Sequence, residues 1–191
     1  MISNDSTGRR TGPGEITFTR LLPGPIDRVW TYLVDPAKRA LWLAGGPMEP
    51  LVGGAVTLSF KHADLATPDD PPPEKYREMA AGDCSFSGHI TRWEPPHTLA
   101  YTWQESGGSN SEVTFELFPE ESKVRLVLTH RRLSDQLDEM GSVAGGWHTH
   151  LAILLAQLAG EPAPSFWSTH TKLEEAYRRS LAPRLTRHTA D

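Results

Sequence analysis

Cysteine and long apolar runs are nearly absent from this sequence. Cys84 is the only cysteine among 191 residues, which excludes an intramolecular disulfide and suits a reducing compartment. No stretch approaches the apolar length that spans a bilayer, and residues 1–14 contain no apolar segment like that of a secretory signal. We therefore expect a cytoplasmic protein with no membrane partner.

Positive charge is also scarce. The chain has 19 Lys and Arg residues against 24 Asp and Glu, a formal net charge of -5, and its pI is near 5.9. Such a chain lacks the overall positive field that attracts a protein to phosphate backbones. We expect no nucleic-acid partner. The length suits one domain with a single core rather than two domains.

Motifs for metal ions and for nucleophilic catalysis are missing as well. There is no CxxC pair, no HExxH pattern and no GxSxG turn. Among the eight histidines, His148 and His150 are two residues apart and would point to different faces of a helix. No acidic residue stands on an otherwise apolar face, where a catalytic carboxylate is expected. The sequence thus predicts neither a metal nor a cofactor.

What the chain does contain is a regular series of strands and helices. Alternating apolar residues predict a strand over residues 15–22, and Pro25 and Asp35 then introduce two short helices. Further strands are expected over residues 56–60, 84–93, 98–104, 112–118 and 123–130, separated by turns rich in proline, glycine and serine. This order predicts an α+β fold built on an antiparallel meander.

The most informative segment is GWHTHLAILLAQLAG, residues 146–160. At helical spacing, Trp147, His150, Leu151, Leu154 and Leu158 fall on one stripe. A helix packed on a sheet needs only aliphatic residues on that stripe. The aromatic ring and the imidazole therefore indicate that the helix also lines a cavity that contains a polar group. The alternative is a core histidine whose ring nitrogens are satisfied by backbone groups.

The ends of the chain and one long connection complete the expected organisation. Residues 1–14 are expected to be a disordered arm, residues 15–160 a domain, and residues 161–191 an extension with one helix. Ser168 would cap that helix, and Leu173, Tyr177 and Leu181 would form an apolar edge for the body or for a second copy. From Pro183 onward we expect a frayed tail. Residues 63–83 form a connection longer than a hairpin needs, with a helical turn at 74–79, which is either a lid or a solvated loop.

Five segments in order carry a resemblance to a known family. They are PGPIDRVWTYLVDPAKRALWL, LVGGAVTLSF, SGHITRWEPPHTLAYTWQE, SEVTFELFPEESKVRLVLTHRRL and GWHTHLAILLAQLAG. They are similar to the strand-helix-helix opening, the Gly-Gly turn, the strand pairs and the final helix of the AHSA1-like branch of the START/Bet v 1 (SRPBCC) superfamily. The resemblance spans residues 15–160. It implies a helix-grip fold of order β-α-α-β(5–6)-α, in which a curled antiparallel sheet surrounds a long C-terminal helix, here followed by one extra helix.

The resemblance also implies a cavity, which this superfamily uses for binding, cyclisation and hydrolysis. His130 shares strand parity with Leu126 and Leu128, so it should face inward and could meet His150. Gln157 lies close in angle to His150 and could orient its ring or sit at the solvent boundary. The predicted ligand-binding residues are Trp42, Tyr101, Trp103, His130, Trp147, His150, Leu151, Leu154 and Gln157. Alternatively, His130 caps a strand end and the aromatic residues simply fill the core.

Three functions compete at this point. The leading hypothesis is non-enzymatic binding of an apolar or aromatic small molecule between the sheet and the long helix. The second is a cyclase, hydrolase or isomerase that uses His150 or His130 as a general acid or base on a polarised carbonyl. The third is an interaction protein, either chaperone-linked or a homodimer through the last helix. Relatives include a domain of an activator of the Hsp90 ATPase, but this chain shows no sign of that protein's separate N-terminal domain, which argues against chaperone activation.

Overall fold

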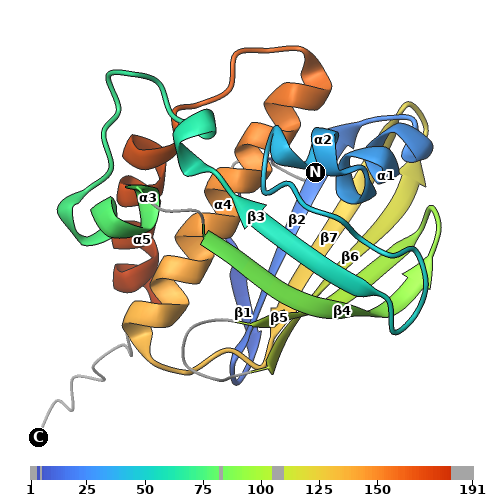
Figure 1. Ribbon diagram of the computed structural model, residues 1–191, viewed down its shortest axis with the longest axis horizontal. Coiled ribbons are helices and arrows are strands. Elements are labelled where there is room, and N and C mark those ends of the chain that lie inside the picture. The colour runs from blue at the N-terminus through green and yellow to red at the C-terminus, as the bar shows by residue number, and fades with distance from the viewer. Residues whose placement is uncertain (1–3, 5, 82–83, 105–109, 182–191) are drawn as a thin grey trace, which may run out of the picture.

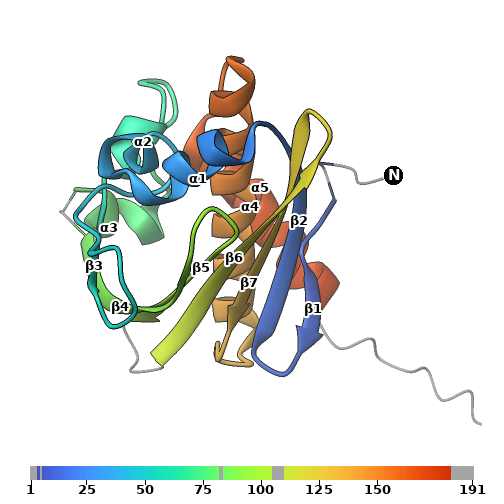
Figure 2. The ribbon, with the colours of Figure 1, turned by 90° about the vertical axis from the view of Figure 1, so that its right-hand side faces the viewer.

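Seven antiparallel strands form one curled, open sheet, and the long helix α4 lies along its concave side (Figures 1 and 2). The computed structural model describes residues 4, 6–81, 84–104 and 110–181. The strands follow the order β1-β2-β7-β6-β5-β4-β3 across the sheet. Their bounds are β1 (Arg9–Gly12), β2 (Glu15–Pro23), β3 (Ala55–Phe60), β4 (Cys84–Glu94), β5 (Thr98–Gln104), β6 (Asn110–Glu120) and β7 (Lys123–Arg131).

Five helices and two short 3₁₀ turns accompany this sheet in the described residues. They are α1 (Ile26–Val34), α2 (Pro36–Ala40), α3 (Arg77–Ala81), α4 (Leu137–Ala159) and α5 (Phe166–Leu181), with the short 3₁₀ turns η1 (His62–Leu65) and η2 (Glu74–Tyr76). Alternate residues of β2 and β7 are buried, and they form one core with the leucines of α4. Full burial of each such side chain contributes about 1.5–3 kcal/mol to folding. The predicted α+β helix-grip fold is therefore confirmed.

The amino-terminal segment differs from the sequence-based expectation. Arg9–Gly12 were expected to be disordered, but they form strand β1, which pairs with β2 at the edge of the sheet. The backbone N–H of Gly8 donates a hydrogen bond of 2.6 Å to the Tyr177 hydroxyl on α5. The segment is ordered because it has partners on both the sheet and the last helix. Residues 1–3 and 5 of the expected arm lie outside the described residues, as does the tail expected from Pro183 onward.

The last helix packs on its own domain. Tyr177 is 1% exposed and lies edge-on to Phe18, and its hydroxyl is 2.9 Å from Nδ1 of His148. Leu173 and Leu181 also pack against the core. Of the predicted apolar edge, Tyr177 is thus buried by this chain itself, while Leu173 and Leu181 are partly buried.

Helix α4 begins at Leu137, nine residues before the expected start at 146. Its additional turns carry Gly141 and Gly145, which the sequence pattern does not favour in a helix interior. Both glycines face α5 at close range: an added Cβ would lie 2.7 Å from Cγ of Arg178 and 2.9 Å from the backbone nitrogen of Glu174, respectively. The helix extends through these residues because their small size lets α5 pack tightly against it.

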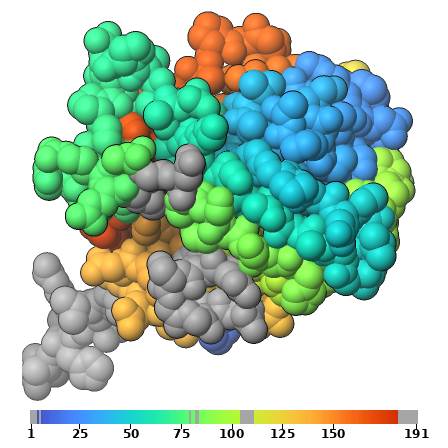
Figure 3. Space-filling view, in the orientation of Figure 1, coloured from blue at the N-terminus to red at the C-terminus, as the bar shows by residue number. Residues whose placement is uncertain are grey.

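Residues 62–81, which we call the strap, run across α5 (Figure 1). In the space-filling view, the teal and green atoms of the strap hide most of α5 from this side (Figure 3). The expected helical turn at 74–79 is present as η2 and the start of α3. The strap is a folded layer rather than an open loop.

Asp70 of the strap caps the last helix. Its carboxylate accepts hydrogen bonds from the backbone N–H groups of Trp167 at 2.7 Å and Ser168 at 2.9 Å, and from the Ser165 hydroxyl at 2.6 Å. The helix consequently starts at Phe166, and the expected cap by Ser168 is wrong. A carboxylate at this end satisfies orphan N–H groups and complements the helix dipole.

Candidate functional site

A cavity of about 360 Å³ lies between strands β3 to β5, helices α4 and α5, and the strap. This volume is within the usual range of small-molecule sites, about 300–1,000 Å³. Its apolar wall is mostly aromatic. The aromatic rings are Phe60, Tyr76, Phe86, Trp103, Trp147, Phe166 and Trp167. Such walls stack on flat apolar groups and supply large contact area with little loss of side-chain freedom.

Helix α4 supplies one side of the cavity through a single stripe of residues. The α4 residues that line the cavity recur every three to four positions, which places them on one face of the helix: Glu139, Ser142 and Val143, Gly146 and Trp147, and His150. The stripe continues beyond the hollow, where Leu151 and Leu154 are fully buried core residues. The cavity therefore occupies only the amino-terminal part of the predicted stripe.

His150 is held in one orientation by a backbone contact. Its Nδ1 lies 2.6 Å from the carbonyl oxygen of Trp42, to which the Nδ1–H donates. Nε2 is then the acceptor nitrogen of the neutral ring. Burial, with the neighbouring His62 as a smaller cause, lowers the pKa of His150 to about 3. The imidazole is thus neutral at physiological pH, with one nitrogen satisfied by the backbone.

His62 is a second histidine of the cavity that sequence reasoning missed. Its ring stacks on Phe60 with centroids 5.5 Å apart and lies 6.0 Å from the His150 ring. Burial lowers the pKa of His62 to about 4, and the nearby His170 contributes to this shift as a smaller cause. A signal was present: His62 continues the inward parity of Leu58 and Phe60 beyond the end of β3.

His130 belongs to a closed hydrogen-bond chain behind the cavity wall. The Trp147 indole N–H donates to His130 Nδ1 at 2.9 Å, so Nε2 carries the proton and donates to the Ser111 hydroxyl at 2.9 Å. That hydroxyl donates to the Trp103 carbonyl oxygen at 2.8 Å. Burial lowers the pKa of His130 to about 3. His130 does not line the cavity; it orients Trp147.

Replacing Trp147 with phenylalanine should destabilise the protein by about 1–3 kcal/mol, since it leaves Nδ1 of buried His130 without its donor. Urea unfolding monitored by circular dichroism measures this loss. Trp93→Phe is the matched control, because Trp93 packs edge-on against Trp30 and its indole N–H bonds to no described residue. Equal losses in the two variants would show that the His130 chain contributes nothing specific.

The structure brings together only part of the predicted site. Trp103, Trp147 and His150 line the cavity. Gln157 is half-buried further along α4 and does not reach it. The other predicted residues are buried in the core outside the cavity: Trp42, Tyr101, His130, Leu151 and Leu154. Inward parity and helical spacing identify the buried face, but they do not say which part of that face is left unfilled.

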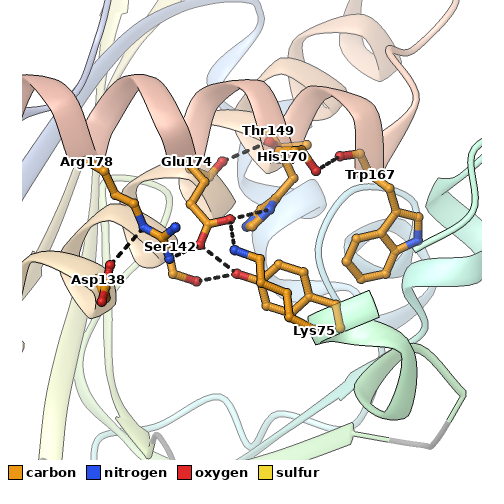
Figure 4. A network of polar contacts seen from close by, with 11 residues as sticks. Lys75, Asp138, Ser142, Thr149, Trp167, His170, Glu174 and Arg178 are labelled. Atoms are coloured by element: carbon orange, nitrogen blue, oxygen red, sulfur yellow. Dashed lines mark hydrogen bonds and ion pairs between the residues drawn. The ribbon is translucent and has the colours of Figure 1, made fainter. Parts of the chain in front are cut away.

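A buried carboxylate fastens the strap beside the cavity (Figure 4). Glu174 of α5 accepts hydrogen bonds from Lys75 Nζ at 2.5 Å, from the Tyr76 hydroxyl at 2.9 Å and from Arg178 at 3.0 Å. The Tyr76 hydroxyl also lies 3.0 Å from Oγ of Ser142 on α4. Burial alone would raise the pKa of Glu174, but the hydrogen bonds from Lys75 and Tyr76 outweigh it and the pKa is lowered.

The described residues include neither a metal-ligand cluster nor a membrane-spanning helix. In that part of the chain, no group of three or more His, Cys, Asp or Glu side chains is arranged to hold a metal ion. No helix there is both long enough and apolar enough to cross a bilayer.

A curled antiparallel sheet that grips a long helix, with a hollow between them, defines the helix-grip class of ligand-binding folds. Within that class, the chain belongs to the family described as activator of Hsp90 ATPase homolog 1-like protein, whose family model matches residues 23–160. The predicted family is therefore confirmed. No curated protein matches the sequence.

Solved structures agree with this assignment. The solution structure of a protein from Bordetella parapertussis is 44% identical, with a TM-score of 0.78 over 94% of this chain and 93% of that chain. The crystal structure of CalU16 from Micromonospora echinospora is 26% identical, with a TM-score of 0.66 over 92% of this chain and 96% of that chain. In both cases the matched share of this chain is larger than the part that the family model matches.

Proposed function

We propose that the protein binds an aromatic or apolar small molecule in the cavity between the sheet, α4 and α5. The observation that carries this proposal is the cavity itself, about 360 Å³ of space walled by aromatic rings. Aromatic side chains that line a hollow lack packing partners on that side and leave apolar surface to water. A ligand that stacks on these rings would supply those contacts and remove its own apolar surface from water.

The alternative of histidine catalysis receives less support. A general base works best when its pKa lies near the operating pH, whereas burial lowers the pKa of His150 to about 3. Among the described residues, no carboxylate contacts the His150 ring to raise its basicity. His130 is committed at both ring nitrogens. Binding without chemistry is the function that these two environments favour.

Naphthalene is a suitable first probe, since it is flat, apolar and without polar groups. We expect one naphthalene to bind per chain, with quenching of tryptophan fluorescence from Trp103 and Trp147, which line the cavity. Native mass spectrometry of the protein as purified should be run first to detect a resident ligand that must be removed. Absence of binding up to the solubility limit of naphthalene, in protein free of ligand, would contradict the proposal.

We further propose that the strap is the lid of this cavity. Its residues His62 and Tyr76 line the hollow, while Asp70 and Lys75 fasten it to α5. Breaking these polar contacts would then widen the entrance and speed ligand exchange. Contacts of this kind are worth about 1 kcal/mol each, so single substitutions should shift the opening equilibrium measurably.

Asp70→Ala should speed both association and dissociation of naphthalene roughly fivefold, the factor for a capping contribution of about 1 kcal/mol. Stopped-flow tryptophan fluorescence measures both rates. Asp69→Ala is the matched control, because Asp69 is the exposed neighbour and bonds to no described residue. Unchanged rates in Asp70→Ala, together with the expected loss of stability, would mean that ligand passes elsewhere.

A further inference from the structure

We infer that the ligand is a neutral aromatic alcohol of the phenol class, whose hydroxyl donates a hydrogen bond to Nε2 of His150. This inference rests on the proposed binding function and adds the chemistry that the cavity selects. It follows from three features: the fixed orientation of His150, the neighbouring His62, and the charges that border the hollow.

The orientation of His150 places a hydrogen-bond acceptor, Nε2, in the cavity wall. Because Nδ1–H donates to the Trp42 carbonyl at 2.6 Å, Nε2 presents a lone pair. No described residue donates to Nε2, and the residue is 6% exposed. Nε2 is not one of the fully enclosed side-chain atoms that lack a partner, so it is open to the hollow that His150 lines. A ligand hydroxyl that reaches it gains a hydrogen bond that naphthalene cannot make.

His62 complements this acceptor. Its ring centroid is 6.0 Å from that of His150, and burial holds the pKa values of the two rings at about 4 and about 3. A neutral His62 carries one N–H, which can donate to the ligand oxygen. A hydroxyl both donates and accepts, as this pair requires, whereas a carboxylate or an ether oxygen only accepts.

The charges around the hollow disfavour anions. Among the described residues that line it, the only formally charged one is Glu139, and no lysine or arginine takes part. Lys75 of the strap and Arg178 of α5 are both bound to Glu174. An aromatic carboxylate would therefore lose its hydration without gaining a counter-charge, which is costly in a buried site.

Three probes with the same ring system test the inference by titration calorimetry at neutral pH: naphthalene, 2-naphthol and 2-naphthoate. We expect 2-naphthol to bind about tenfold tighter than naphthalene and 2-naphthoate to bind at least ~100-fold weaker than 2-naphthol. If naphthalene binds but 2-naphthol is no tighter, or if 2-naphthoate matches 2-naphthol, the inference is wrong and the proposed function stands. If no probe binds, both fail.

The variant His150→Asn assigns the acceptor. The asparagine amide N–H can still donate to the Trp42 carbonyl, while its only acceptor, Oδ1, takes the place of the ring Cδ2 and does not extend to the position of Nε2. We expect it to weaken 2-naphthol binding about tenfold more than naphthalene binding, so that the preference for 2-naphthol is lost. His148→Asn, a buried position on the same helix outside the cavity lining, should keep that preference. In the unsubstituted protein, the NMR signal of His150 Nε2 should shift with 2-naphthol and not with naphthalene. A preference retained in His150→Asn, or an Nε2 signal that does not move, would overturn the assignment.

Discussion

Replacing Gly146 with leucine should weaken naphthalene binding roughly 100-fold, because overpacking of a filled cavity costs about 1–3 kcal/mol. Gly146 lines the cavity, and a Cβ added to it would meet only Nε2 of His170, at 4.0 Å. The side chain therefore has room to enter, and it would occupy the space of the ligand. Stability should rise by about 0.5–1 kcal/mol, since a helix interior favours leucine over glycine.

Gly146→Ala is the matched control for this experiment. It brings a similar gain in helix propensity but adds a single carbon at the edge of the hollow, so it should bind naphthalene nearly as well as the unsubstituted protein. Calorimetry gives the affinities and urea unfolding gives the stabilities. A Gly146→Leu protein that is stable and still binds naphthalene normally would place the ligand outside this cavity, and the proposed function would be wrong.

The fold could be predicted because its signals are local and repeated. Period-two alternation marks β2 and β7, and the stripe on 146–160 marks the buried face of α4. The start of α4 could not be found in this way, because Gly141 and Gly145 are poor helix formers. Their place in the helix depends on α5, a partner distant in sequence.

The candidate site was predictable in part for a related reason. Trp103, Trp147 and His150 lie on inward faces, and inward parity is readable from sequence. His130 has the same parity as these residues, yet a serine on the neighbouring strand satisfies it and keeps it out of the cavity. His62 reaches the cavity because the strap returns to α5, and the bonds of Asp70 that fix this return join residues about 97 apart in the sequence. Such pairings have no local signature.

The same leucine placed one residue earlier should have the opposite effect on stability. Gly145 faces α5, where an added Cβ would lie 2.9 Å from the backbone nitrogen of Glu174 and 3.0 Å from its Cα. Backbone atoms in a helix cannot turn aside as a side chain can, so α5 must shift. We expect Gly145→Leu to lower the free energy of unfolding by about 3 kcal/mol, the upper part of the range for overpacked cores, as measured by urea unfolding.

Gly141→Ala tests whether the loss of stability comes from a clash with the backbone of α5 or from any atom added to the glycines that face α5. Its Cβ would meet Cγ of Arg178 at 2.7 Å, and that flexible side chain can move, so the cost should be small and partly offset by helix propensity. Because Phe166 and Trp167 of α5 form part of the cavity wall, Gly145→Leu should also weaken naphthalene binding, through a displaced wall rather than an occupied hollow. We expect both leucine variants to bind naphthalene weakly, with Gly145→Leu less stable and Gly146→Leu more stable than the unsubstituted protein. That result would show that Gly145 permits close packing of α5, whereas Gly146 leaves space for the ligand. Equal stability of the two leucine variants would instead mean that α5 is not held closely against α4.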